Sequence, residues 1–233
     1  MNFTVHQIFF DFYSNGFNDL FSESSLRFER WAEGNGYEYK LWGEWECESL
    51  IREYPEFEGV YQTARFPIMK VDMMKLLILH SEGGLYADLD VFPQRESVKM
   101  GDLILTFDKT TGGGSRQRKK QLGTEIIQSS KGNPFLLDLL RYNKSQISEK
   151  EKIEVYENRK ARFVTHTTGP NCLQRFLRIN PGIGYDTYTT NTLEFGEKWK
   201  YMGLGETEGV DFISHHSASW YGLLGESGSR KSS

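Results

Sequence analysis

The sequence predicts a single α/β domain, and three observations support this class. A chain of 233 residues is long enough for one domain with a sizeable core. The run FTVHQIFFDF at 3–12 is rich in β-branched and aromatic residues, which indicates a first strand that is buried on both faces. A helical segment separates it from an alternating second strand, YEYKLW at 37–42. Strand, helix and strand in this order open an α/β sheet with right-handed crossovers.

The helix between these strands is predicted from its end signals. The segment SESSLRFERWAEGNG offers Ser22 or Ser24 as the N-cap and Gly34 or Gly36 as the stop. We therefore expect a short helix here, packed beside the first strand.

The best-defined helix in the chain is predicted from Pro67 to His80. Proline suits its first turn, and Gly83 and Gly84 mark its end. Its apolar residues leave almost no polar face, so this helix should be buried.

The remaining predicted elements are shorter. They are a helix at 44–53, strands at 102–107 and 124–128, and helices at 134–142 and 171–179. The last third of the chain is rich in glycine and aromatic residues and predicts short strands at best. Because no repeat or linker divides the chain, we expect one domain over residues 1–225 and a disordered tail at 226–233.

Composition excludes some classes of protein. The net charge of −4 and the pI near 5.8 do not resemble a nucleic-acid-binding footprint. Cys47 and Cys172 lie far apart and without metal-ligand spacing, which favours two buried thiols in a reducing compartment. No charged and apolar leader opens the chain, and no apolar stretch approaches the ~20 residues of a membrane span. We therefore expect a cytoplasmic protein without a transmembrane segment.

The stretch GGLYADLDV at 83–91 carries the strongest chemical signal. In a strand, Asp88 and Asp90 would project to one side, ~7 Å apart along the chain, and would repel each other without a cation nearby. Oxygen ligands favour Mg²⁺ or Mn²⁺, and two carboxylates leave coordination sites for water and substrate phosphates. A bare pair of this kind also occurs at strand ends that face water. The preceding helix and Gly-Gly turn place this pair at the carboxyl end of a strand, where open α/β sheets bind ligands.

Two further charges interrupt the buried helix. Asp72 and Lys75 stand at i,i+3 spacing among apolar residues. A plain intrahelical ion pair is one explanation. The other is that Asp72 accepts hydrogen bonds from hydroxyls of a sugar or ribose, since buried charges are costly unless they are paired or functional.

These residues together resemble glycosyltransferase family 32. The stretch RFPIMKVDMMKLLILHSEGGLYADLDV at 65–91 is similar to the sugar-binding region of that family, which contains the D-x-D motif. Three shorter stretches follow the family order: HQIFF at 6–10, TGP at 168–170 and HHSASW at 215–220. The resemblance implies a GT-A fold, which is a Rossmann-like sandwich that binds a nucleotide-sugar together with Mn²⁺ or Mg²⁺.

The resemblance also implies roles for single residues. The metal ligands would be Asp90, Asp88, which also reaches the ribose or acts through water, and His215, with His216 as the neighbouring alternative. The donor would be bound by Phe9, Asp72, Lys75, Gly84, Asp88 and Trp220. Phe9 would stack on the base, although a first-strand phenylalanine also fits a plain core position. Trp220 would donate its indole N–H to the diphosphate, or simply close the hydrophobic core.

One departure from the family pattern lies within the sugar-binding region. Lys75 stands where the family usually has arginine, so a bidentate contact is lost. A catalytic nucleophile is not evident. Glu125 is a candidate, and a same-face internal return without a protein nucleophile is the alternative. The Gly-rich segment 110–122 is a lid, an acceptor contact or an ordinary loop.

These observations predict a metal-dependent retaining glycosyltransferase of the kind used in polysaccharide biosynthesis. It would move a hexose from a nucleotide-sugar, a UDP-sugar in preference to a GDP-sugar, to a hydroxyl of a glycan, a glycolipid or another acceptor. The first rival is a catalytically degenerate nucleotide-sugar-binding module. The second, a metal-dependent phosphotransferase or nuclease, lacks both a phosphate loop and a third acidic ligand cluster.

Overall fold

The computed structural model describes residues 3–11, 16–108, 121–151, 159–192 and 210–215. The strands are β1 Thr4–Ile8, β2 Glu38–Trp42, β3 Gly84–Ala87, β4 Val91–Pro93, β5 Leu103–Asp108, β6 Gln121–Ser129, β7 Asp186–Thr192 and β8 Phe212–Ser214. The helices are α1 Asp19–Gly34, α2 Glu44–Ile51, α3 Pro55–Gln62, α4 Pro67–Glu82, α5 Pro134–Lys150, α6 Lys160–Thr167 and α7 Pro170–Ile179.

All the described strands join one mixed sheet in the order β2-β1-β3-β6-β5-β7-β8-β4. β1 lies parallel to β2 and β3, and β7 lies parallel to β5 and β8. β6 runs antiparallel to both of its neighbours, and β4 runs antiparallel to β8. The expected α/β class is therefore confirmed, with parallel pairings in the majority.

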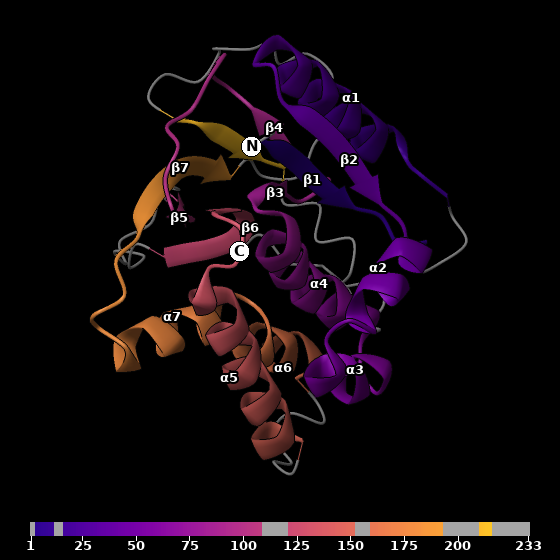
Figure 1. Cartoon of the computed structure of the whole chain (residues 1–233), viewed down its shortest axis with the longest axis vertical. Helices are drawn as coiled ribbons and strands as arrows, with labels where there is room; N and C mark the ends of the chain where they lie inside the picture. The colour runs from indigo at the N-terminus through magenta and orange to yellow at the C-terminus, as the bar shows by residue number, and fades with distance from the viewer. Residues whose placement is uncertain (1–2, 12–15, 109–120, 152–158, 193–209, 216–233) are drawn as a thin grey trace, which may run out of the picture.

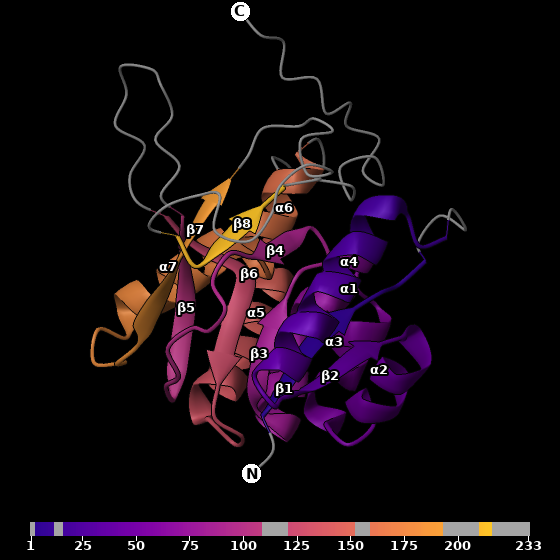
Figure 2. The same cartoon turned by 90° about the horizontal axis from the view of Figure 1, so that it is seen from above.

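The sheet curls, because β3 and β4 are close in sequence but far apart in strand order. Three residues, 88–90, connect β3 near one side of the sheet to β4 at the opposite edge. Figure 1 shows the edge strand β4 above β1 and β3, and Figure 2 shows β8 next to β4. The edge strand β4 thus returns towards β1 and β3, close to the segment that carries the aspartate pair.

Two cores lie on the two faces of this curled sheet. The larger one packs α2–α5 and α7 against the outer face, and a row of residues across β3, β6 and β5, namely Tyr86, Ile127 and Leu105, belongs to it. The second fills the inside of the curl, where Phe28 and Trp31 of α1 meet residues of β1, β3 and β8. Helices therefore cover both faces, as Figure 1 shows.

Helix α4 and the strand after it have clear local causes. Proline at position 67 begins the helix, and Gly83 ends it with φ +72°, a conformation that suits glycine. At Gly84, where φ is +97°, a Cβ atom would lie 2.1 Å from the carbonyl oxygen of Thr4. The glycine therefore allows β3 to approach β1 closely.

Most predicted elements are present, with some corrections. Helix α1 begins earlier than expected, because Asn18 rather than Ser22 or Ser24 caps it by accepting a hydrogen bond from the backbone N–H of Phe21. Helices α3 and α6 were not predicted, and α5 extends beyond its predicted end to Lys150. The loop expected at 110–122 is described only at 121–122, and the tail at 226–233 lies outside the described residues.

The expectation of two buried thiols is met. Cys47 and Cys172 are free and fully buried, and burial raises the pKa of each thiol to about 12. In the part of the chain that the structure describes, no helix combines the length and the apolar character that crossing a membrane requires.

Candidate active site at the end of β3

The aspartate pair lies in a turn rather than in a strand, which corrects the sequence-based geometry. β3 ends at Ala87 and β4 begins at Val91. The backbone N–H of Val91 donates to the carbonyl of Asp88 at 3.2 Å, and the N–H of Asp88 donates to the carbonyl of Glu125 at 2.8 Å. Both aspartates are partly buried. Their proximity therefore comes from a turn fixed at both ends, and not from strand alternation.

The carboxylate of Asp88 faces the α4 side of the sheet. The hydroxyl of Tyr86, two residues earlier on the same face, donates a 2.7 Å hydrogen bond to Oδ1 of Asp88. Burial raises the pKa of Asp88 to about 7, and the negative charge of Asp90 adds to this, while the charge of Lys75 and the Tyr86 hydrogen bond oppose it. Burial and Asp90 thus destabilise the ionised form of Asp88 despite Lys75, and a bound cation would stabilise it.

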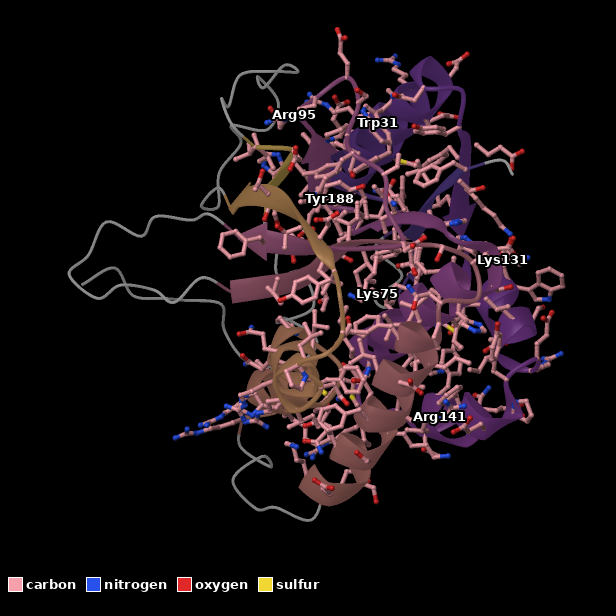
Figure 3. The ribbon with its side chains drawn as sticks, turned by 60° about the vertical axis from the view of Figure 1, so that its left-hand side comes forward. Trp31, Lys75, Arg95, Lys131, Arg141 and Tyr188 are labelled. Atoms are coloured by element: carbon pink, nitrogen blue, oxygen red, sulfur yellow. The ribbon has the colours of Figure 1, made fainter. Side chains whose placement is uncertain are left out.

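Lys75 and Asp72 of α4 form the buried ion pair expected from their spacing. The ammonium Nζ of Lys75 lies 2.7 Å from Oδ1 of Asp72, and the two side chains are 3% and 9% exposed. Figure 3 shows Lys75 in the interior of the molecule. The hydroxyl of Thr168, in the connection between α6 and α7, donates a 2.7 Å hydrogen bond to Oδ2 of Asp72.

The charge of Lys75 also interacts with the aspartate turn. Burial lowers the pKa of Lys75, but the charge of Asp72 and then those of Asp88 and Glu125 outweigh burial and raise it. Lys75 is therefore a fixed cation beside the aspartates, and its Nζ also lies 5.5 Å from the ring centroid of Tyr86.

His215 is held next to Asp90 by the backbone. Its N–H donates to the carbonyl of Asp90 at 2.8 Å, and its ring lies 4.4 Å from that of Phe92. Burial lowers the pKa of His215, although Asp90 opposes the shift, so the imidazole is neutral. Its Nε2 is buried without a hydrogen-bond partner, which is the state expected of a nitrogen that awaits a ligand. His216 lies outside the described residues.

Glu125 lies next to the aspartate turn. It is part of β6, and its backbone carbonyl holds Asp88. Its carboxylate Oε1 accepts a 3.3 Å hydrogen bond from the hydroxyl of Thr190 on β7. The candidate nucleophile therefore lies among the predicted site residues, and the structure adds no evidence for covalent chemistry.

Three further predicted donor-binding residues stay untested by the contacts that the structure describes. Phe9 follows the end of β1 and contacts Phe17, with ring centroids 4.8 Å apart. Gly84 lies at the start of β3, the end opposite to the aspartates, and its contact with Thr4 accounts for the glycine. Trp220 lies outside the described residues. Donor contacts by these residues stay predictions.

A divalent cation fits the aspartate turn as an open site rather than a closed one. Among residues that the structure describes, no three His, Cys, Asp or Glu side chains gather as a ready-made metal cluster. Asp88 and Asp90 supply two hard oxygen ligands. His215, whose backbone N–H bonds Asp90, adds an Nε2 atom that has no hydrogen-bond partner among the described residues. Such a set leaves most coordination positions to water and phosphate, as in Mg²⁺ and Mn²⁺ nucleotide sites.

Sequence reasoning missed three residues that support the site. Tyr86 holds the Asp88 carboxylate and Thr168 holds Asp72. The side chain of Gln7 in β1, which is fully buried, donates a 3.2 Å hydrogen bond to the carbonyl of Asp88. A signal existed for Tyr86, since it precedes Asp88 by two residues on one strand face.

Comparison with known proteins agrees with this geometry. Residues 23–108, which include α4, β3 and both aspartates, match a family model described as "Glycosyltransferase sugar-binding region containing DXD motif". This part of the chain is therefore similar to the sugar-binding region of glycosyltransferases. The resemblance stated from the motifs is thereby confirmed for this part of the chain.

Named relatives match about half of this chain. Mannosyl phosphorylinositol ceramide synthase SUR1 of Saccharomyces cerevisiae is 35% identical over 126 residues, which are 48% of this chain and 30% of that protein. Inositol phosphoceramide mannosyltransferase 3 of Schizosaccharomyces pombe is 29% identical over 106 residues, which are 45% of this chain and 28% of that protein. The chain therefore matches only about a third of the length of these relatives.

A solved structure extends the likeness to the fold. PaToxG glycosyltransferase superposes with a TM-score of 0.50 at 16% identity, and the match covers 78% of this chain and 71% of that one. The GT-A fold expected around the sugar-binding region is thus confirmed.

Proposed function

We propose that this chain is a metal-dependent retaining glycosyltransferase that moves a hexose from a nucleotide-sugar to a hydroxyl of a glycan or glycolipid. The observation that carries the proposal is the turn at 88–90. It presents two aspartates beside a buried cation, Lys75, at the carboxyl end of β3.

The chemistry of glycosyl transfer suits this charge arrangement. Cleavage of the bond between sugar and phosphate leaves negative charge on the diphosphate. Mn²⁺ or Mg²⁺, held by Asp88 and Asp90 with His215 as a further ligand, would neutralise that charge as a Lewis acid. Lys75 adds a positive charge that needs no reorganisation, because Asp72 fixes its position.

The sugar-binding residues follow from the same contacts. Asp72 accepts hydrogen bonds from sugar hydroxyls through the lone pairs that Lys75 and Thr168 leave free. Retention of configuration rests on the family resemblance. Glu125 serves as the nucleophile, or the acceptor attacks from the face that the leaving group departs, with Glu125 as a nearby charge.

Substrate identity is open to a direct screen. UDP-sugars are the first choice from the sequence, while the names of two relatives refer to mannosyl transfer to inositol phosphoceramides. A mannosyl donor and a phosphoinositol-type glycolipid acceptor therefore belong in the screen. The cytoplasmic location expected from the sequence stays a prediction.

A thermal-shift screen of UDP- and GDP-sugars with and without Mn²⁺ tests this proposal, because a ligand that binds only the folded state raises Tm. We expect one nucleotide series to raise Tm only when Mn²⁺ is present, and Asp90→Asn to abolish the shift. Asp102→Asn is the matched control, since Asp102 is exposed and precedes β5 at the opposite end of the sheet. Absence of a response to any donor contradicts the proposal.

Donor turnover separates the enzyme from its rival. A binding module gives the same thermal shift but does not hydrolyse the donor. We expect slow release of nucleoside diphosphate by the wild-type protein with Mn²⁺, and none by Asp90→Asn.

A further inference from the structure

A cavity lies next to α7, beside the strands β5 and β6. Its volume is ≈ 750 Å³, and residues of β5, β6, α7 and the connection from α7 to β7 line it. This size suits a ligand of several hundred daltons. None of the site residues described above lines this cavity.

The register of the sheet places the cavity beside the aspartate turn. Tyr86, Ile127 and Leu105 form one row across β3, β6 and β5 on the face of the larger core. Asp88 follows Tyr86 by two residues, and Phe107, which lines the cavity, follows Leu105 by two. The pairing of β5 with β6 shifts register after Leu105, so Phe107 pairs with Leu122 of β6, whereas Asp88 bonds Glu125 of the same strand.

Strand β6 links the cavity to the aspartate turn. Leu122 lines the cavity, and Glu125, three residues later, bonds the backbone of Asp88. Three residues of strand span ~10 Å. The cavity therefore lies two strand spacings across the sheet and three residues along it from Asp88, a separation of ~14 Å.

The lining of the cavity mixes apolar side chains with the polar Gln174, Asn180 and Thr187. Phe107, Leu122, Leu177 and Ile183 supply carbon surface, while the exposed Arg178 supplies a positive charge. None of the described lining residues carries a carboxylate.

Apolar surface continues outside the cavity. Ile179 at the end of α7 is 58% exposed, and Tyr185 at the mouth is 42% exposed. Exposed apolar side chains next to a cation form a surface suited to an amphiphile with negative charge.

We propose that this cavity binds the apolar chain of the acceptor, and that Arg178 pairs with an anionic group between that chain and the hydroxylated head. This inference rests on the proposed glycosyl transfer. The head then extends the remaining ~14 Å towards Asp88, where the donor sugar would be transferred.

Binding of n-decyl phosphate below its micellar concentration, measured by calorimetry, tests the cavity. Inorganic phosphate and n-decyl maltoside separate the contributions of chain and charge. We expect decyl phosphate to bind at least about tenfold more tightly than inorganic phosphate, because burial of a few methylene groups is worth that factor. Equal binding of the two phosphates overturns the proposal.

Five variants locate the binding. Leu177→Asp should weaken decyl phosphate binding by about tenfold or more, whereas Leu26→Asp, at an exposed leucine of α1, should not. Arg178→Gln should weaken decyl phosphate about threefold to tenfold and leave decyl maltoside unchanged, with Arg52→Gln as the exposed-arginine control. If Leu177→Asp does not fold, Thr187→Trp fills the cavity from β7 and should abolish binding. Unchanged binding in a folded cavity variant overturns the proposal.

The position of the probe is tested with Mn²⁺ and UDP. Protons of bound decyl phosphate should relax faster with Mn²⁺ in the wild-type protein and should not in Asp90→Asn. A lack of relaxation while the donor still raises Tm overturns the acceptor assignment and leaves the transferase proposal intact. If the donor does not raise Tm and decyl phosphate binds, the transferase proposal fails, and with it the role of the cavity as an acceptor site.

Discussion

The hydroxyl of Thr168 and the ammonium of Lys75 engage the two carboxylate oxygens of Asp72 separately, each at 2.7 Å. Thr168 and Asp72 are 96 residues apart in the sequence. The hydrogen bond thus ties the connection between α6 and α7 to the middle of α4. Asp72 keeps one orientation as a result, with lone pairs on each oxygen left for a ligand.

Thr168→Val should disturb the donor site through Asp72. The change leaves a buried carboxylate oxygen without its partner, which costs ~1–3 kcal/mol of stability, and we expect donor KM to rise several-fold. Steady-state kinetics and urea denaturation measure the two effects. Thr168→Ser retains the hydroxyl and should restore both values, and Thr165→Val on the neighbouring helix should change neither. Wild-type KM in Thr168→Val would mean that the hydrogen bond does not position Asp72.

The ion pair between Asp72 and Lys75 should show strong coupling. Removal of one partner leaves a buried charge unpaired, at a cost of about 3–5 kcal/mol, whereas removal of both can be nearly neutral. We therefore expect Asp72→Asn with Lys75→Met to destabilise the protein less than the sum of the single changes. A double-mutant cycle from denaturant unfolding gives the coupling energy. Additive effects would show that the pair contributes no more than two independent side chains.

Gly84 should tolerate no side chain. Gly84→Ala places a Cβ atom 2.1 Å from the Thr4 carbonyl at φ +97°, so β1 and β3 must separate. We expect a loss above ~4 kcal/mol or failure to fold. Gly34→Ala is the matched control, because its Cβ meets nothing within 4 Å at the end of α1. There we expect a gain of ~0.5–1 kcal/mol. Similar Tm values for the two variants would contradict this account.

His6 should make stability depend on pH. Its Nε2 donates to the carbonyl of Gly83 and its Nδ1 accepts from the indole N–H of Trp42, so the neutral ring is fully bonded. Burial lowers the pKa of His6 to about 4, against a small opposing effect of the bond to Gly83 and a further lowering by Lys40. The unfolded chain binds the proton near pH 6.5. The contribution of His6 is therefore complete above pH 6.5 and is lost as pH falls to 4, by about 3 kcal/mol.

The measurement is urea denaturation between pH 7 and pH 4 for wild-type protein and His6→Gln, without metal. Asp88 acts in the opposite sense over the same range, because its raised pKa favours the folded state as pH falls. Only the difference between the two proteins therefore reports on His6. We expect His6→Gln to lose less stability than wild type on acidification. Parallel curves would show that His6 takes up its proton equally in both states.

Elements with strong local signals were predictable from the sequence. The start of α4 at Pro67 and its end at Gly83 follow from backbone rules that act within one helix turn. Helix α3, which begins at Pro55, was missed because eight residues carry too little periodicity. The N-cap at Asn18 was missed because Ser22 and Ser24 offer equal local signals, and tertiary packing decides between them.

The candidate site was predictable in composition but not in geometry. The motif named Asp88 and Asp90, while the turn that holds them depends on a bond to Glu125 in a distant strand. The contact of Thr168 with Asp72 crosses 96 residues, and no local pattern reports such a pairing. The role of Tyr86 could have been predicted, because strand alternation alone puts it beside Asp88.

The strand order of the sheet determines when the aspartate turn reaches its final geometry during synthesis. Residues 88–90 emerge early, but β4, which follows them, pairs with β8 at residues 212–214. The aspartates therefore gain their final geometry only after the last described strand has left the ribosome. A nascent or prematurely terminated chain that lacks β8 therefore carries the complete motif and still has no anchored β4.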